Sequence, residues 1–83
     1  MLQLTLYSRQ GCHLCEDMLQ LLLQLQQEIS FELDIRDVDT NAEWRQHYHE
    51  RVPTLLAGTQ LLSEYFLDLG RLRAYLNEQS GAR

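Results

Sequence analysis

Two cysteines separated by two residues, Cys12 and Cys15, lie between a segment with strand periodicity and a segment with helix periodicity. Leucines at every second position alternate with polar residues and a tyrosine over residues 2–8, which predicts a strand. Gly11 then marks a turn, and apolar residues three or four positions apart predict an amphipathic helix over about 13–28. The apolar stripe of this helix consists of Leu14, Met18, Leu21, Leu22, Leu25 and Ile29. We therefore expect the cysteine pair at the start of a helix that directly follows a strand.

The middle of the chain predicts a second strand and a short helix. Apolar and charged residues alternate over about 31–36, so one face of this strand is expected to be buried and the other exposed, as at a sheet edge. The buried face would consist of Phe31, Leu33 and Ile35. Thr40 is followed three residues later by Glu43, the spacing of a capping box. This predicts a short helix over about 41–49.

The last third of the chain predicts a hairpin and a final helix. Two short apolar segments, 53–57 and 60–62, are separated by a turn that contains Gly58, a pattern typical of antiparallel strands. Ser63 is expected to cap a helix over 64–78. The apolar stripe of that helix would consist of Tyr65, Leu69, Leu72 and Leu76. The whole pattern predicts an α/β domain with a mixed sheet.

Length and charge narrow the class of protein further. The 83 residues allow one domain, over 1–83, with one modest core, and we expect a monomer. The net charge is −5 and all seven cations are arginines without a basic run, which argues against nucleic acid or an anionic membrane as partner. Because no apolar stretch approaches the roughly 20 residues of a membrane span, and the first residues lack a basic flank, a cytoplasmic protein is expected.

The cysteine spacing points to chemistry rather than to a structural disulfide. Closing so short a loop removes little entropy from the unfolded chain, so the pair adds little stability. At a helix start, unpaired amides and the helix dipole favour a thiolate, which predicts Cys12 as the nucleophile. Cys15 would follow one turn later and act as the resolving thiol, attacking a mixed disulfide formed at Cys12.

Two other interpretations of the cysteines stay open. In the first, Cys12 and Cys15 would serve only as small apolar side chains at a helix start. Alternatively, they would form half of a zinc site, for which only the histidines at 13, 47 and 49 are available as further ligands. The context between a strand and a helix favours redox chemistry over both.

The cysteines belong to a longer pattern, Leu6-Tyr7-Ser8-Arg9-Gln10-Gly11-Cys12-His13-Leu14-Cys15, and a second pattern, Arg51-Val52-Pro53-Thr54, follows far along the chain. Together they resemble the glutaredoxins, especially small bacterial glutaredoxin-like proteins of unassigned role. The resemblance implies a thioredoxin-like α/β fold, with a mixed four-stranded sheet flanked by three helices in the order β-α-β-α-β-β-α. It also implies a cis bond between Val52 and Pro53, facing Cys12, where the Val52 backbone pairs with an incoming peptide or glutathione.

The resemblance suggests roles for three other residues near the cysteines. Arg9 stands where glutaredoxins usually carry a lysine, and its charge would stabilise the thiolate or hold a glutathione carboxylate; it would otherwise be a solvated surface arginine. Tyr7 also matches the family, or simply packs beside the sheet. His13 would draw charge from the Cys12 thiolate when protonated, although an exposed histidine without such a role is the more common case. Trp44 is expected to serve packing.

The chain departs from the family at two places. It has no proline directly after Cys12, and no Gly-Gly-x-Asp segment before the last helix, where it reads Leu61-Leu62-Ser63-Glu64-Tyr65. Dithiol exchange is therefore favoured over glutathione-dependent catalysis.

Three functions remain in view. The first is a thiol-disulfide oxidoreductase that reduces protein disulfides without a tightly bound cofactor or metal. Its reductant would be glutathione, as a co-substrate, or a thioredoxin-reductase-like enzyme. The alternatives are an iron-sulfur or metal-binding module and a redox-inert protein-interaction domain.

Overall fold

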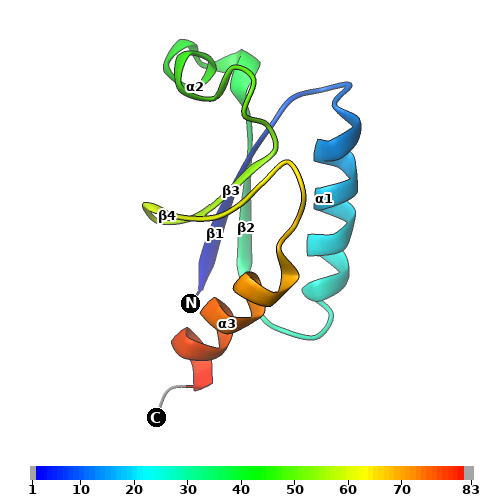
Figure 1. Ribbon diagram of the computed structural model, residues 1–83, viewed down its shortest axis with the longest axis vertical. Coiled ribbons are helices and arrows are strands. Elements are labelled where there is room, and N and C mark those ends of the chain that lie inside the picture. The colour runs from blue at the N-terminus through cyan, green and yellow to red at the C-terminus, as the bar shows by residue number, and fades with distance from the viewer. Residues whose placement is uncertain (1, 82–83) are drawn as a thin grey trace.

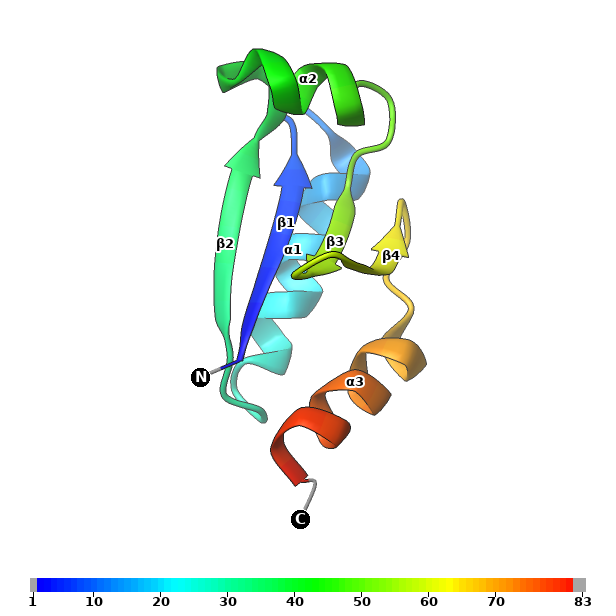
Figure 2. The ribbon, with the colours of Figure 1, turned by 90° about the vertical axis from the view of Figure 1, so that its left-hand side faces the viewer.

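A computed structural model describes residues 2–81 of the chain. Its strands are β1 (Gln3–Ser8), β2 (Glu32–Asp37), β3 (Thr54–Ala57) and β4 (Gln60–Glu64). They form one mixed sheet in the order β2-β1-β3-β4 (Figures 1 and 2). β1 and β2 are parallel, whereas β3 is antiparallel to both β1 and β4. The predicted mixed sheet, the hairpin and the edge position of the second strand are confirmed.

The helices are α1 (His13–Leu25), α2 (Ala42–Tyr48) and α3 (Leu69–Gly81), with a 3-10 turn, η1 (Val38–Thr40), between β2 and α2. α1 runs along one face of the sheet, and α2 lies at the end where β1 and β2 finish (Figures 1 and 2). α3 lies toward the opposite end. None of the helices within residues 2–81 has the length and hydrophobicity of a membrane-spanning segment.

The core lies between the sheet and α1 and α3. Side chains in a strand alternate between its two faces, so Leu4 and Leu6 of β1 point to the same side and both are fully buried. Leu55 of β3 pairs with Leu6 and continues this surface. The helices cover it with Met18, Leu22, Leu25, Leu72 and Leu76. Burial of these side chains is the main term that stabilises the fold.

Two burial predictions are partly wrong. On α1 the buried residues are Cys15, Met18, Leu22 and Leu25. Leu21, which the apolar stripe includes, is 48% exposed, because its position on the helix points away from the sheet. Ile35 of the edge strand is 49% exposed, since it lines a pocket beside the start of α1 instead of packing under the helix. α1 also ends at Leu25, earlier than expected.

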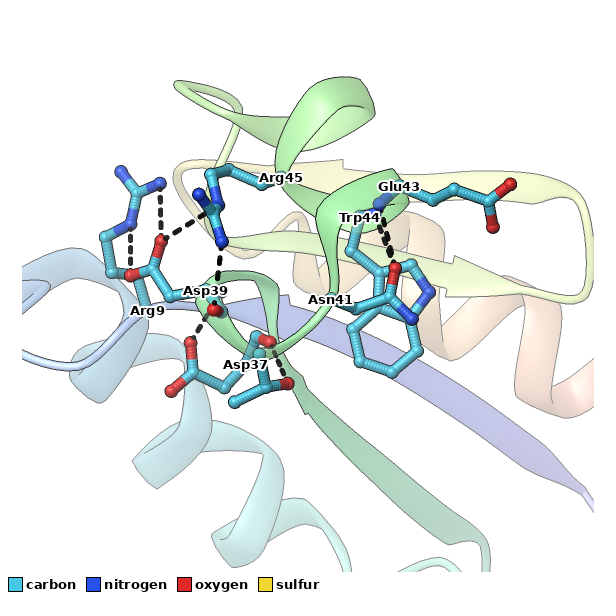
Figure 3. Close-up of polar contacts among 8 residues, drawn as sticks. Arg9, Asp37, Asp39, Asn41, Glu43, Trp44 and Arg45 are labelled. Carbon is cyan, nitrogen blue, oxygen red and sulfur yellow. Dashed lines mark hydrogen bonds and ion pairs between the residues drawn. The ribbon is translucent and has the colours of Figure 1, made fainter.

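Both predicted helix caps are corrected by the structure. Asn41 caps α2, and its side chain accepts from the amides of Glu43 and Trp44 at 2.9 and 3.1 Å (Figure 3). The Thr40 hydroxyl instead donates to the backbone carbonyl of Asp37, at the end of β2. The last helix begins at Leu69 rather than at residue 64, and its first turn is capped by Asp68, which accepts from the Arg71 amide. Ser63 accepts from the Asp68 amide and so holds the loop that precedes the helix.

Candidate dithiol site

The first cysteine caps the helix that follows β1. Cys12 has extended backbone angles, φ −91° and ψ 111°, and its Sγ accepts from the amide of Cys15 at 3.2 Å. Gly11, with φ +76°, allows the chain to turn into the helix at this point. The sulfur therefore takes the place that a serine or aspartate oxygen takes in ordinary N-caps. An amide that donates to sulfur favours the negatively charged thiolate once the disulfide is reduced.

The two cysteines form a disulfide and differ in exposure. Their Cα atoms are 5.2 Å apart. Cys15 is 3% exposed and belongs to the buried face of α1, whereas Cys12 is partly exposed. Cys12 is therefore the more accessible sulfur of the pair.

The loop before β3 reaches the same end of the sheet as the cysteines. Tyr7, at the end of β1, pairs with Thr54, which directly follows Pro53. The Val52–Pro53 peptide bond is cis, as the resemblance implies. Pro53 is buried and its carbonyl accepts from the Tyr65 amide at 2.8 Å, while Val52 is partly exposed. The segment that contains Val52 thus reaches the end of the sheet at which β1 finishes, and its pairing with a substrate stays a prediction.

Arg9 is held by an ion pair. Its Nε and Nη2 donate to the two carboxylate oxygens of Asp39 at 3.0 and 3.2 Å. Figure 3 shows the same carboxylate facing Arg45, whose Nε lies 3.9 Å from Asp39 Oδ1. The guanidinium of Arg9 is therefore engaged by a carboxylate rather than simply solvated. Its effect on the thiolate stays a prediction.

Tyr7 is buried in an aromatic cluster under α2. Its ring stacks on Tyr48 with centroids 4.1 Å apart and meets Trp44 edge-on at 5.8 Å. Nη1 of Arg36 donates to the Tyr7 hydroxyl at 2.8 Å, and its guanidinium lies 5.2 Å from the Trp44 ring centroid. This geometry agrees with the packing interpretation of Tyr7 and Trp44. Sequence reasoning missed Arg36 and Tyr48, because nothing in their local pattern places them beside β1.

Burial and the nearby Tyr7 raise the pKa of Tyr48 above its usual value of about 10. A raised pKa in the folded state means that Tyr48 contributes stability below pH 10, and that this contribution is lost as the pH rises through the folded value. We expect Tyr48→Phe to remove this loss. Urea unfolding between pH 8 and pH 11 measures it: the free energy of unfolding should fall less steeply above pH 10 in the variant, and parallel curves would contradict the assignment.

The end of β4 is tied to the loop before Pro53. Arg51 Nε donates to Glu64 Oε2 at 2.7 Å, and this hydrogen bond raises the pKa of Arg51. The Tyr65 hydroxyl donates to the Glu50 carbonyl at 3.0 Å. Tyr65 has φ +65°, and the Phe66 amide donates to the Glu64 carbonyl, which together close a tight turn. This turn explains why no helix starts at residue 64.

Two other side chains in this part of the fold are exposed. His13 is exposed at the first position of α1, next to Cys12, and Phe66 is 72% exposed in the loop after β4. Within residues 2–81 no group of three or more His, Cys, Asp and Glu side chains is arranged to hold a metal ion.

A family model described as "Glutaredoxin-like domain (DUF836)" matches residues 3–77 of the chain. A comparison of this chain with curated proteins found no match. Among solved structures, protein Ne2328 from Nitrosomonas europaea is 42% identical, with a TM-score of 0.80 over 90% of this chain and 91% of that one. Protein XcR50 from X. campestris is 32% identical, with a TM-score of 0.70 over 89% and 95% of the two chains. Both were determined as structural genomics targets.

More distant structures agree in fold alone. A glutaredoxin from E. coli is 22% identical, with a TM-score of 0.56 over 96% of this chain and 99% of that one. A thioredoxin from Halobacterium salinarum is also 22% identical, with a TM-score of 0.64 over 93% and 73% of the two chains. The predicted thioredoxin-like α/β fold, with its four-stranded mixed sheet and three helices, is confirmed.

Proposed function

Because the chain belongs to the glutaredoxin-like domain family, we propose that it is a small thiol-disulfide oxidoreductase that reduces protein disulfides through Cys12 and Cys15. One observation carries the proposal. The Sγ of Cys12 caps α1 and accepts the Cys15 amide, so a partly exposed sulfur sits where a thiolate is stabilised, directly beside a buried partner.

The proposed cycle uses the difference between the two cysteines. In the reduced protein the Cys12 thiolate attacks one sulfur of the substrate disulfide and releases the other as a thiolate, which takes a proton from water. Cys15 then loses its proton to water, attacks Sγ of Cys12 and releases the second substrate thiolate. Two electrons have passed to the substrate, and the Cys12–Cys15 disulfide remains. Two glutathione molecules, which leave as glutathione disulfide, or the dithiol of a thioredoxin-reductase-like enzyme restore the reduced protein.

Other residues have supporting roles in this proposal. The Val52 backbone pairs with the substrate chain beside the buried Pro53, as in the family that the chain resembles. Arg9, held in place by its pair with Asp39, influences the electrostatic environment of the Cys12 thiolate. His13 adds positive charge next to Cys12 at low pH. The cycle needs no tightly bound cofactor or metal, and a monomer in the cytoplasm suffices for it.

An equilibrium titration tests the function directly. The protein is incubated in glutathione buffers of increasing oxidised fraction, the thiols are trapped by alkylation, and the dithiol and disulfide forms are counted by mass spectrometry. The reduced protein is then mixed with insulin, whose disulfide reduction is followed by turbidity. We expect reversible conversion between the two forms and catalysed reduction of insulin. A reduced protein that leaves insulin intact would refute the proposal, and a pair of sulfurs that does not exchange with glutathione would exclude glutathione as the reductant.

A further inference from the structure

Two arginines, one shortly before Cys12 and one directly before Val52, are already bound to carboxylates of the same chain. Arg9, three residues before Cys12, pairs in a bidentate manner with Asp39. Arg51, directly before Val52, pairs with Glu64 at 2.7 Å. A negatively charged substrate would have to compete with these internal partners for either guanidinium.

The Arg51–Glu64 pair is held in place from several sides. The Thr54 hydroxyl donates to the Arg51 carbonyl, and the guanidinium lies 5.6 Å from the centroid of the Tyr48 ring. Glu64 is the last residue of β4 and pairs across the sheet with Thr54, which directly follows Pro53. The pair therefore stands beside the backbone segment that the proposed function assigns to the substrate.

We propose that Glu64 is a specificity-determining residue: by occupying Arg51 it selects polypeptide disulfides without a nearby carboxylate over the disulfide of glutathione. This inference rests on the proposed function. Glutathione is a short peptide with two carboxylates and one ammonium group, so each half of its disulfide is anionic near pH 7. If the glutathione half of the mixed disulfide at Cys12 pairs with Val52 as proposed, it lies along the segment that Glu64 adjoins through Thr54, and like charges in proximity oppose binding.

The exposure of the pair sets the expected size of the effect. The Arg51 side chain is 50% exposed and that of Glu64 is 29% exposed, so water screens their interaction in part. Removing the charge of Glu64 favours the binding of anionic glutathione in two ways. It removes the repulsion between Glu64 and the glutathione carboxylate, and it frees the guanidinium of Arg51. We expect a change in selectivity of about three- to tenfold, which falls as salt is added.

The experiment compares Glu64→Gln with the wild type on two disulfides. The reduced protein is mixed either with glutathione disulfide or with the uncharged bis(2-hydroxyethyl) disulfide, and quenched samples give the two second-order rate constants. In each reaction Cys12 attacks, Cys15 resolves, and two small thiols are released per protein disulfide formed. The readout is the ratio of the glutathione rate to the uncharged rate, and we expect Glu64→Gln to raise this ratio about three- to tenfold.

Two further variants separate this role from a general effect of charge. Glu28→Gln removes the same charge from an exposed ion pair with Arg73, which joins the turn after α1 to α3. It should leave the ratio unchanged. Arg51→Ala combined with Glu64→Gln should lose most of the gain, because the freed guanidinium is then absent.

The outcomes distinguish failure of the inference about Glu64 from failure of the proposed oxidoreductase function. If the wild type reacts with the uncharged disulfide but Glu64→Gln leaves the ratio unchanged, the inference fails and the oxidoreductase stands. The inference also fails if Glu28→Gln raises the ratio equally, or if the double variant keeps the full gain. A wild type that reacts with neither disulfide overturns both.

Discussion

Replacing Cys12 by serine is expected to lower the rate of disulfide reduction by about a thousandfold or more, because a serine hydroxyl at this position stays protonated and cannot attack a disulfide. The hydroxyl of Cys12→Ser still accepts the amide at the start of α1, since serine is a preferred N-cap residue. The fold should therefore persist while the chemistry is lost. Insulin reduction gives the activity, and far-UV circular dichroism gives the fold.

Cys15→Ser is the matched variant and should fail at a different step. Cys12 is still present, so it attacks the substrate, but no second thiol releases the product. We expect one mixed disulfide per protein molecule, visible by intact mass after reaction with glutathione disulfide and absent in Cys12→Ser. Equal activity of Cys12→Ser and the wild type would contradict the assignment of the nucleophile. A mixed disulfide on Cys15 in the Cys12→Ser variant would reverse the two roles.

The position of Cys12 at a helix start is predictable from sequence because it depends on local structure. A strand with period two, a turn at Gly11 and a helix with period 3.6 are encoded within the first 28 residues, and they place Cys12 at a helix start without reference to the rest of the chain. The same holds for the hairpin around Gly58, whose φ of +63° suits the glycine in the turn.

Element boundaries are less predictable, because neighbouring residues compete for the same role. Thr40 and Asn41 are adjacent and both are common N-caps, and the register of η1 decides that Asn41 faces the free amides. The start of α3 depends on Tyr65, whose hydroxyl bonds to the carbonyl of Glu50, 15 residues earlier in the chain. No local pattern contains that contact.

The charges around the site are the least predictable part. Arg9 and Asp39 are 30 residues apart, and Arg51 and Glu64 are 13 apart, so each pair exists only because the sheet brings distant segments together. Sequence alone places an arginine near Cys12 and leaves its partner undetermined. This is why a solvated Arg9 and a substrate-binding Arg9 are equally compatible with the sequence, whereas the structure shows an internally neutralised one.

Leu22→Ala is expected to lower the free energy of unfolding by about 3 kcal/mol, whereas Leu21→Ala should cost less than about 1 kcal/mol. The two leucines are neighbours in α1 and both belong to the apolar stripe predicted from sequence. Leu22 is fully buried against the sheet, and its truncation leaves a cavity in the core; Leu21 is 48% exposed and leaves none.

Urea unfolding of the oxidised protein provides the comparison, with the midpoint and the slope fitted for each variant. Both substitutions replace leucine by alanine in the middle of the same helix, so helix propensity changes equally and cancels in the difference. The difference in the free energy of unfolding between the two variants therefore reports the difference in burial. Equal losses in the two variants would mean that α1 is rotated relative to the sheet. Because Cys15 shares the buried face with Leu22, such a rotation would also expose the resolving thiol and remove the asymmetry on which the proposed chemistry depends.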